Sequence, residues 1–540
     1  MPGQFDYAAF GLQPPRHRID PPVGPRDVAS LVPRAKALVP NNEALADDKV
    51  RYTFSELDEQ VTRTAGFFRD SGLEPGDRIA MSVLNRVEAV VAFFAAMQFG
   101  LVWVGMNRIL PPADKKFILA HSGTKLMLAD TISFAEIEAL KAELPELMRL
   151  VDIDSDPAWV SALSCPRAPA LPWPEIDPFV PAAIMYTSGT TGVPKGVVHS
   201  QHNMVTVAAG NSAHGLMSPE ARRGSALPVT ITNVMILGPV FSYWNLQPFS
   251  LGQTTRIEPM IEWLHKEGIG QIPFVPTMVY DLLQADLDLP EKLVVGCGGA
   301  PVAQPIREKF RTRYGYPLET SYGLTEAPTI VATSNGLVGP DGASGLAAPY
   351  LQITIRDKAG CALSPETIGE VCMGAIPDGP WANVYTPPLG YWRDAVKTAE
   401  LLKDGLVHTG DVGSLDEDGW LTIADRSSEL ILRGGSNVYP AEIERVLHML
   451  DSVADCAIIG QPDERLGMKT VAFVQRSHPA AEEEALQAEL RAQCLEHLSR
   501  YKVPDEWIIV DEFPRNAMGK IIKPRLREML AGNLGAVLRP

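Results

Sequence analysis

The sequence has few cysteines, and none of them forms a recognisable pair. Six cysteines are spread over 540 residues, without a CxxC spacing or another metal-ligand pattern. This scatter excludes a disulfide framework and predicts reduced thiols in a reducing compartment. The amino-terminal stretch MPGQFDYAAFGLQPPRHRID also lacks the apolar core of a secretory signal, so we expect a cytoplasmic protein.

An excess of basic residues is also missing. The chain has 48 Lys and Arg against 65 Asp and Glu, which gives a formal net charge of -17. A general nucleic-acid binder needs a basic face, so we expect no nucleic-acid partner. The balance does not exclude a small anionic ligand, because local N–H groups and a few cations can hold one.

Long uncharged runs are rare, and the one at 89-AVVAFFAAMQFGLVWVGM-106 is nearly long enough to span a bilayer. Gly100 suits the C-terminal cap of a helix, and the residues after it are typical of a buried strand. The run therefore predicts a core helix followed by a core strand, and no transmembrane segment.

Helix-like and strand-like segments alternate from about residue 50 onward. Such alternation predicts an α/β fold with parallel-rich sheets covered by helices. A chain of 540 residues is too long for one compact core. A break near 425-DRSSE-429 precedes a segment with its own helices and strands, so we predict a large N-terminal domain, 1–426, and a small α+β C-terminal domain, 427–540.

The glycine-rich stretch 187-TSGTTG-192 lies between two apolar runs, which argues against a flexible linker. The Walker template GxxxxGK[ST] does not fit, because Lys195 is followed by Gly196 and not by Ser or Thr. Backbone N–H groups, hydroxyls and Lys195 would suit a polyphosphate. From this loop alone, an ordered turn without a ligand remains the alternative.

Further short motifs follow the loop in order. They are 298-GGAP-301, 321-SYGLTE-326, 408-HTGD-411, 425-DRSSELILRGGSNVYPAEIE-444 and 514-PRNAMGKI-521. Together they resemble the adenylate-forming superfamily, which includes acyl-CoA synthetases, firefly-type luciferases and nonribosomal peptide adenylation domains. The resemblance covers roughly residues 50–530. It implies a luciferase-like large domain and a mobile small domain that swings between two poses.

The resemblance also implies a two-step reaction. A carboxylate attacks the α-phosphorus of ATP to give an acyl-adenylate and pyrophosphate, and the thiol of coenzyme A then displaces AMP. The first step needs the charge on the carboxylate and phosphates to be neutralised. The implied cofactor is Mg²⁺, with ATP, coenzyme A and a carboxylic acid as substrates.

The implied ATP-binding residues form several clusters along the chain. They are Thr187, Ser188, Gly189, Thr190, Thr191, Gly192 and Lys195; Gly299, Ala300 and Pro301; Ser321, Tyr322, Gly323, Leu324 and Thr325; Asp411, Ile423 and Arg426; and Lys520. The glycine-rich loop would bind the β- and γ-phosphates, and Tyr322 would lie against the adenine. Asp411 would accept from the ribose hydroxyls, and Arg426 would contact ribose or phosphate.

Thr187, Glu326 and Lys520 are the implied catalytic residues. Glu326 is the implied magnesium ligand, since a hard cation prefers carboxylate oxygen. Lys520 would bridge the substrate carboxylate and the α-phosphate during adenylation. Taken singly, Lys520 is more often an exposed lysine and Asp411 an N-cap, and Glu326 could be a solvated loop carboxylate. The ordered set favours the functional interpretation.

The C-terminal part carries the implied thiol site and hinge. Gly434, Gly435 and Ser436 would let the pantetheine arm of coenzyme A pass close to the backbone. The hinge would lie at Ser428, where the commoner family pattern is Arg-x-Lys/Asp-Asp. Ser428 and Glu429 depart from that pattern, which leaves the energetics of the motion open.

The acid-binding part departs further from the family. Members usually carry Pro-Leu-Phe-His where this chain has 228-PVTI-231, so the gate is aliphatic, or Phe241 or Tyr243 does that work. The expected acyl pocket is mostly apolar, without an acidic anchor for an amino group. Its candidate residues are Ile231, Phe241, Phe274, Met278, Val295, Cys297, Thr320 and Ala327.

We therefore expect an AMP-forming acyl-CoA synthetase for a medium-chain, alicyclic or aromatic acid, with a role in fatty acid metabolism. The alternative is an adenylating enzyme that delivers the acyl group to a carrier protein or an amine. A silent nucleotide-binding regulator is disfavoured, because no chemically required residue is missing. His199 and His202 are expected to be structural, since no third metal ligand is near. Whether the chain forms a homodimer stays open.

Overall fold

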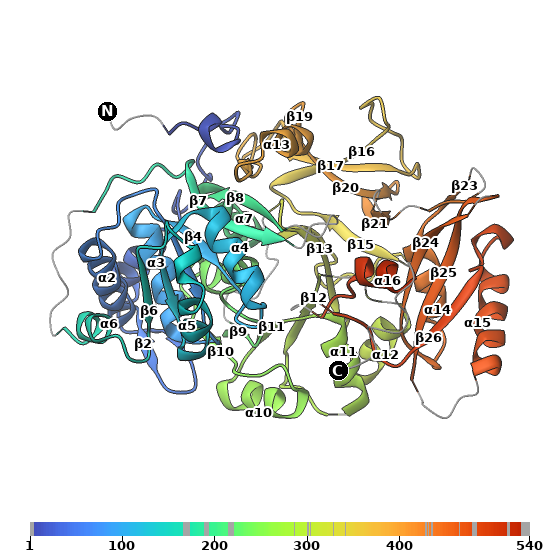
Figure 1. The fold of residues 1–540 in the computed structure, drawn as a ribbon, viewed down its shortest axis with the longest axis horizontal. Coiled ribbons are helices and arrows are strands. Elements are labelled where there is room, and N and C mark those ends of the chain that lie inside the picture. Colours follow the sequence, from blue (N-terminus) through green and yellow to red (C-terminus); the bar gives the residue numbers. More distant parts are fainter. Residues whose placement is uncertain are drawn as a thin grey trace.

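The structure of the chain is a computed structural model with three β-sheets (Figure 1). It describes residues 5–165, 173–187, 194–213, 221–285, 287–299, 302, 304–327, 329–340, 342–426, 429, 431–433, 436–463, 465–477, 483–515 and 519–530. Within these residues the sheets have 14, seven and five strands. Elements outside the sheets and their flanking helices are η1 (Ala8–Phe10), α1 (Leu31–Leu38), η2 (Lys141–Glu143), α13 (Ala395–Leu401) and η4 (Arg500–Lys502).

The seven-stranded sheet has the order β18-β8-β7-β4-β3-β5-β6. Its strands are β3 (Arg78–Ser82), β4 (Val102–Gly105), β5 (Thr124–Ala129), β6 (Arg149–Asp152), β7 (Pro181–Thr187), β8 (Lys195–Ser200) and β18 (Gly390–Tyr391). Its helices are α2 (Phe54–Asp70), α3 (Val87–Phe99), α4 (Pro112–Ser122), α5 (Thr131–Glu138) and α6 (Pro157–Leu163). The strands from β7 to β6 are parallel neighbours, as helical crossovers require, whereas β8 and β18 are antiparallel.

The uncharged run at 89–106 forms part of the core. Helix α3 is buried at every position except Glu88 and ends at Gly100, whose φ of +74° suits a residue without a Cβ. Strand β4 follows and pairs with β3 and β7. The predicted buried helix and strand are confirmed. Among the described residues, no helix has the length and apolar character needed to cross a membrane.

The 14-stranded sheet has the order β16-β17-β20-β21-β15-β14-β13-β12-β11-β9-β10-β1-β2, with β19 paired to β20. Its first strands are β1 (Glu43–Ala46), β2 (Arg51–Thr53), β9 (Arg223–Ser225), β10 (Phe249–Leu251), β11 (Gln271–Phe274), β12 (Val294–Cys297) and β13 (Glu319–Leu324). The others are β14 (Thr329–Thr333), β15 (Ala343–Ala347), β16 (Leu351–Arg356), β17 (Gly369–Ala375), β19 (Leu402–Lys403), β20 (Leu406–Leu415) and β21 (Trp420–Arg426).

Two cores cover the parallel half of this sheet. One face packs on α10 (Ile257–Glu267), α11 (Pro276–Ala285) and α12 (Gln304–Tyr314). The other face belongs to the larger core, which it shares with α7 (Gln201–Ala213), α8 (Thr232–Met235), η3 (Ile236–Val240) and α9 (Phe241–Trp244). The residues of β11 and β12 that face α10 to α12 are buried, whereas Pro273, Val294 and Gly296 on the other face are half-buried.

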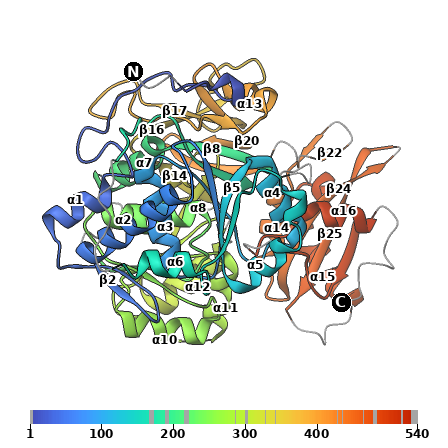
Figure 2. The same cartoon turned by 60° about the vertical axis from the view of Figure 1, so that its left-hand side comes forward.

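The C-terminal sheet contains β22 (Ile431–Arg433), β23 (Ser436–Val438), β24 (Val453–Asp463), β25 (Gly467–Arg476) and β26 (Glu506–Val510). Helices α14 (Pro440–Leu447), α15 (Glu483–His497) and α16 (Lys523–Leu530) accompany it. In both Figure 1 and Figure 2 this sheet lies at one side of the molecule, apart from the two larger sheets. The predicted α/β fold class, with a large sheet-rich part and a smaller C-terminal part, is confirmed. The domain limit at residue 426 stays a prediction.

The two large sheets approach each other very closely at Gly105, the last residue of β4. A Cβ atom added at Gly105 would lie 1.8 Å from the carbonyl oxygen of Thr230. That oxygen belongs to the backbone between β9 and α8, so it has little freedom to move away. Glycine at this position therefore sets the distance between the sheets.

We predict that Gly105→Ala destabilises the fold by about 2–3 kcal/mol, because the new methyl group overpacks the contact between the sheets. Gly72→Ala is the matched control. Gly72 has a φ of +79° and no atom within 4 Å of an added Cβ, so only local backbone strain of about 1 kcal/mol is expected. Urea midpoints of both variants test this. An equal or smaller loss in Gly105→Ala would contradict the close approach.

Candidate active site

Strands β13 and β20 bring together residues that are far apart in the sequence. The Tyr322 hydroxyl donates a hydrogen bond of 2.5 Å to Oδ2 of Asp411. Asp411 is 5% exposed and pairs with Arg426 on the neighbouring strand β21. The predicted adenine-side residue and the predicted ribose-side carboxylate therefore share one hydrogen bond, with the backbone of Arg426 beside them.

Tyr391 connects Glu326 with Lys195. Its hydroxyl donates a hydrogen bond of 2.8 Å to Oε1 of Glu326, and Nζ of Lys195 lies 5.4 Å from the centroid of its ring. Tyr391 and Lys195 are on the paired strands β18 and β8 of the seven-stranded sheet, whereas Glu326 follows β13 of the large sheet. A carboxylate and an ammonium group held this way suit a magnesium ion and a phosphate chain, respectively.

The sequence gives no sign of Tyr391. It lies in a two-residue strand, where no periodic pattern can develop, and its hydrogen bond to Glu326 spans 65 positions. The contact of Tyr391 with Glu326 depends on the pairing of β18 with β8, which the sequence does not show. No spacing or motif could have found it.

His199 supports the backbone next to Glu326. Its Nε2–H donates to the carbonyl oxygen of Thr325 at 2.8 Å, and the side chain of Asn203 bonds to the other ring nitrogen. His199 is completely buried, and burial lowers its pKa to about 4. His202, equally buried, contacts the Thr386 hydroxyl and the Ile19 carbonyl, and burial also lowers its pKa to about 4. Both rings are neutral at pH 7 and bond to protein atoms, in agreement with the expected structural role.

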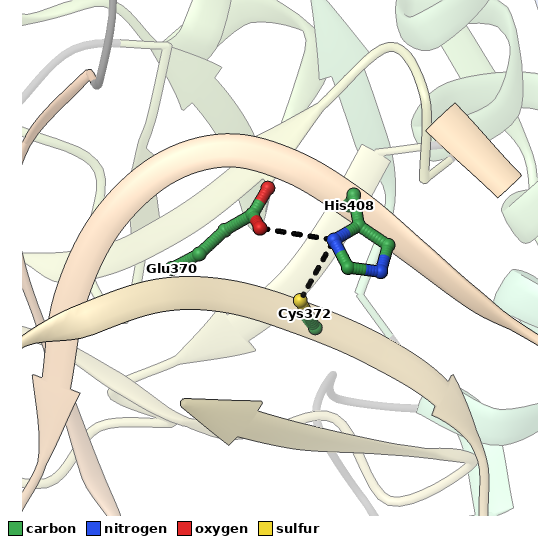
Figure 3. Close-up of side chains that lie close together, drawn as sticks. All are labelled: Glu370, Cys372 and His408. Carbon is green, nitrogen blue, oxygen red and sulfur yellow. Dashed lines mark hydrogen bonds and ion pairs between the residues drawn. The ribbon is translucent and has the colours of Figure 1, made fainter. Parts of the chain in front are cut away.

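Glu370, Cys372 and His408 form the one group among the described residues whose donor atoms could hold a metal ion (Figure 3). Nδ1 of His408 lies 2.9 Å from Oε2 of Glu370 and 3.5 Å from Sγ of Cys372. Burial raises the pKa of the Cys372 thiol to about 12, so the sulfur stays protonated. The imidazole and carboxylate therefore tie β17 to β20, three residues before Asp411.

The loop of Lys520 lies against the large domain. A Cβ added at Gly519 would be 3.6 Å from Oγ1 of Thr277, at the start of α11. Arg515 donates to the Gly519 carbonyl at 2.9 Å and forms a 2.6 Å ion pair with Asp455. Lys520 itself is exposed. The loop is thus held at the edge of the large sheet where β11, β12 and β13 end.

Several predicted site residues lie outside the described residues. They are Ser188, Gly189, Thr190, Thr191, Gly192, Ala300, Pro301, Ser428, Gly434 and Gly435. For Arg426 and Ser436 the structure gives the backbone, in β21 and β23. Of the others, Thr187 ends β7, Gly299 follows β12, Ser321, Gly323 and Leu324 lie on β13, and Ile423 lies on β21. Their functional roles stay predictions.

The eight predicted acyl-pocket residues do not form one group. Phe241 and Ala327 belong to the larger core, on the side of α9. The opposite face of the sheet holds Ile231, Phe274, Met278, Val295 and Cys297, which pack with α10 to α12. Thr320 is buried, and its hydroxyl has no hydrogen-bond partner in the part of the chain that the structure describes. These five residues therefore lie on the side of the sheet opposite to α9.

The two side chains proposed as substitutes for the gate lie in the core. Tyr243 is fully buried and packs against the rings of Phe54 and Phe94. Phe241 is 2% exposed and lies under the guanidinium of Arg223, 4.3 Å from its ring centroid. Both are thus occupied by packing, which favours the aliphatic gate at Ile231.

Comparisons with known proteins place the chain in a family. The model described as AMP-binding enzyme matches residues 32–376, and the model described as AMP-binding enzyme C-terminal domain matches residues 442–520. The first match covers more than half of the chain. The chain therefore belongs to the AMP-binding enzyme family, and the predicted superfamily is confirmed.

Two of the relatives that are 30% identical to the chain differ in the acceptor that their names give. One is a fatty acid–[acyl-carrier-protein] ligase of Streptomyces coeruleorubidus, aligned over 92% of this chain and 94% of the relative. The other is a 2-succinylbenzoate–CoA ligase of Geobacillus kaustophilus, over 91% and 96%. Among solved structures, the o-succinylbenzoate coenzyme A synthetase of Bacillus subtilis in complex with ATP and a magnesium ion matches with a TM-score of 0.80 at 27% identity, over 92% of this chain and 99% of that chain.

We predict that the two buried histidines make the fold sensitive to acid. Each has a pKa near 4 when folded, against about 6.5 when unfolded, so below pH 6.5 the unfolded chain takes up protons that the folded chain refuses. Stability present above pH 6.5 is lost as the pH falls to 4, by about 3 kcal/mol per histidine.

Urea unfolding at several pH values checks this sign. In His202→Gln the loss between pH 7 and pH 4 should shrink by about 3 kcal/mol. His17→Gln, which changes an exposed histidine, should leave the pH dependence unchanged. Parallel pH curves for wild type and His202→Gln would refute the buried neutral state.

Proposed function

We propose that this AMP-binding enzyme is an ATP-dependent acyl-CoA synthetase. It converts a carboxylic acid, ATP and coenzyme A into acyl-CoA, AMP and pyrophosphate through an acyl-adenylate. The observation that carries the proposal is the contact of Glu326 and Lys195 through Tyr391, next to the hydrogen-bonded Tyr322 and Asp411. The predicted enzyme class, an AMP-forming acid–thiol ligase, agrees with the family and with the relatives.

In this proposal Tyr322 and Asp411 bind the nucleoside. Asp411 is buried and accepts from the Tyr322 hydroxyl, so its carboxylate is oriented before a ribose arrives. Oriented acceptors bind hydroxyl groups with little further loss of freedom. Arg426, opposite Asp411 on β21, would contact the ribose or a phosphate.

Glu326 fits a magnesium ion. Tyr391 bonds to Oε1, which leaves Oε2 of the same carboxylate as a hard oxygen donor. Bound there, Mg²⁺ would neutralise charge on the phosphate chain. Lys195 would contact the β- and γ-phosphates together with the loop that begins at Thr187, and Thr325 would donate to a phosphate.

Lys520 would act in the first half-reaction. Its ammonium group would bridge the substrate carboxylate and the α-phosphate and so reduce their repulsion. The position of Gly519 beside Thr277 supports this, because it brings the loop to the edge of the large sheet where Gly299 and Thr325 also lie. The thiol step at Gly434, Gly435 and Ser436, and the hinge at Ser428, stay predictions.

A second acceptor deserves a test, since one relative is named as a ligase for an acyl carrier protein. Pyrophosphate exchange with a panel of acids measures adenylation alone. Thioester formation with coenzyme A then separates the two candidates. Exchange without thioester would favour a carrier protein or an amine as acceptor. A cytoplasmic location and a homodimer remain predictions.

We predict that Lys520→Ala lowers adenylate formation about 100-fold or more, because it removes the charge between two anions. Thioester formation from synthetic acyl-adenylate and coenzyme A should stay within about twofold. Lys403→Ala, at another exposed lysine, is the control and should change neither. Equal losses in both half-reactions would contradict the role of Lys520.

We predict that Tyr391→Phe raises the Mg²⁺ concentration for half-maximal AMP release about tenfold, because Glu326 loses the hydrogen bond that orients it. Tyr385→Phe is the matched control. The Tyr385 hydroxyl is buried and has no hydrogen-bond partner within the described ranges, so its loss should be neutral. A magnesium titration of AMP release measures both variants. An unchanged Mg²⁺ requirement in Tyr391→Phe would contradict the role of Glu326 as a magnesium ligand.

A further inference from the structure

Three polar side chains line one face of the large sheet on neighbouring strands. Arg223 on β9 pairs with Gln271 on β11, and Glu319 on β13 pairs with Gly296 on β12. Arg223 is 4% exposed and Gln271 is 5% exposed. A guanidinium and an amide are therefore buried, and a half-buried carboxylate lies on the same face, in a region where an apolar pocket was expected.

Strand register shows that all three face α9. Arg223 also pairs with Phe249 of β10, and a Cβ added at Gly238 of η3 would lie 2.6 Å from the Phe249 ring. Ile272, Val295 and Cys297 pack with α10 to α12 on the other side. Since successive residues of a strand point to opposite faces, Gln271 and Gly296 face α9, and Glu319 does so with Gly296.

Gly296 leaves space between these groups. Among the described residues, a Cβ added there would have one neighbour within 4 Å, the Ile272 carbonyl oxygen at 4.0 Å. Arg223 and Glu319 lie three strand spacings apart, about 14 Å between backbones, so their side chains bracket the space above β11 and β12. The only charge partner that acts on Glu319 in the described chain is Arg223.

Burial affects both charged groups, and among the described residues Gln271 carries an acceptor without a partner. Burial raises the pKa of Glu319 to about 7, and the charge of Arg223 opposes this rise. Burial lowers the pKa of Arg223 to about 9. Oε1 of Gln271 is buried and has no hydrogen-bond partner among the described residues. Such an acceptor costs free energy in a core unless a ligand satisfies it.

We propose that Arg223, Gln271 and Glu319 bind a hydroxyl group at the far end of the substrate acid. This inference rests on the proposed function and names its substrate class, a carboxylic acid with a distal hydroxyl. A hydroxyl donates one hydrogen bond, to Glu319 or Gln271, and accepts another from Arg223. A second carboxylate would be attracted by Arg223 but repelled by Glu319, and an ammonium group the reverse, whereas a neutral hydroxyl bonds to both without repulsion.

The strands also set the length of the acid. Gly296 lies three residues before Gly299, at the end of the sheet where the predicted ATP-binding residues lie, which corresponds to about 10 Å along an extended strand. An unbranched acid of about eight carbons, or a phenylpropionic acid, spans a similar length. The hydroxyl should therefore be at the terminal carbon or the para position.

The test uses wild-type enzyme with acids that differ only at the far end: octanoate, 8-hydroxyoctanoate, suberate and 8-aminooctanoate. A second pair is 3-phenylpropionate and 3-(4-hydroxyphenyl)propionate. We expect kcat/KM for AMP release to be at least tenfold higher for a hydroxy acid than for its parent. Equal or lower values for both hydroxy acids, or a preference for suberate or the amino acid, would overturn the inference while leaving the proposed function intact. If no acid supports pyrophosphate exchange, both the inference and the proposed function fail.

Single substitutions test whether these side chains cause the preference for the hydroxy acid. Glu319→Leu should reduce the preference for the hydroxy acid to near one, and Gln271→Leu should reduce it at least threefold while keeping the volume of the side chain. Glu400→Leu, at an exposed glutamate, is the control and should keep the wild-type preference. The readout is a ratio between two acids, which a merely destabilised enzyme would not change. An unchanged ratio in both Glu319→Leu and Gln271→Leu would overturn the assignment.

Discussion

The hydrogen bond from Tyr391 to Glu326 joins the two large sheets, and the candidate site depends on where those sheets meet. Tyr391 lies on the edge strand β18 of the seven-stranded sheet, Lys195 lies on the neighbouring strand β8, and Glu326 follows the central strand β13 of the other sheet. The bond from His199 to the Thr325 carbonyl crosses at the same place. The proposed phosphate and metal sites take residues from both sheets and therefore depend on how the sheets meet.

Much of the fold could be predicted because local sequence patterns determine it. The helix that ends at Gly100 and the alternation of helices and strands follow from short-range periodicity and caps. The ordered motifs led to Tyr322, Asp411 and Glu326, which the structure places in one region. The contacts that tie these residues together are long-range, and a single sequence contains no signal for them.

The acyl pocket shows where sequence reasoning fails for a physical reason. Strands β11 and β12 have four residues each, which is too short for a periodic pattern, so the sequence cannot show which side chains face α9. Val295 and Cys297 were predicted for the pocket, the register puts them on the face of α10 to α12 and Gly296 on the other face, and their roles stay predictions. The informative residue was the glycine between them, together with an arginine and a glutamate that no motif marks.

The burial of Arg223 and the partial burial of Glu319 also affect stability. Desolvating a guanidinium and a carboxylate costs several kcal/mol per ion, and apolar residues of similar volume would often give a more stable core. Arg223 lies against Phe241, and Glu319 sits opposite a glycine, so neither side chain fills space that leucine could not fill. A stability argument alone therefore does not account for the pair. Recognition of the substrate does account for it. A pocket with polar groups strongly rejects acids that lack a matching group, whereas an apolar pocket distinguishes chain lengths only weakly.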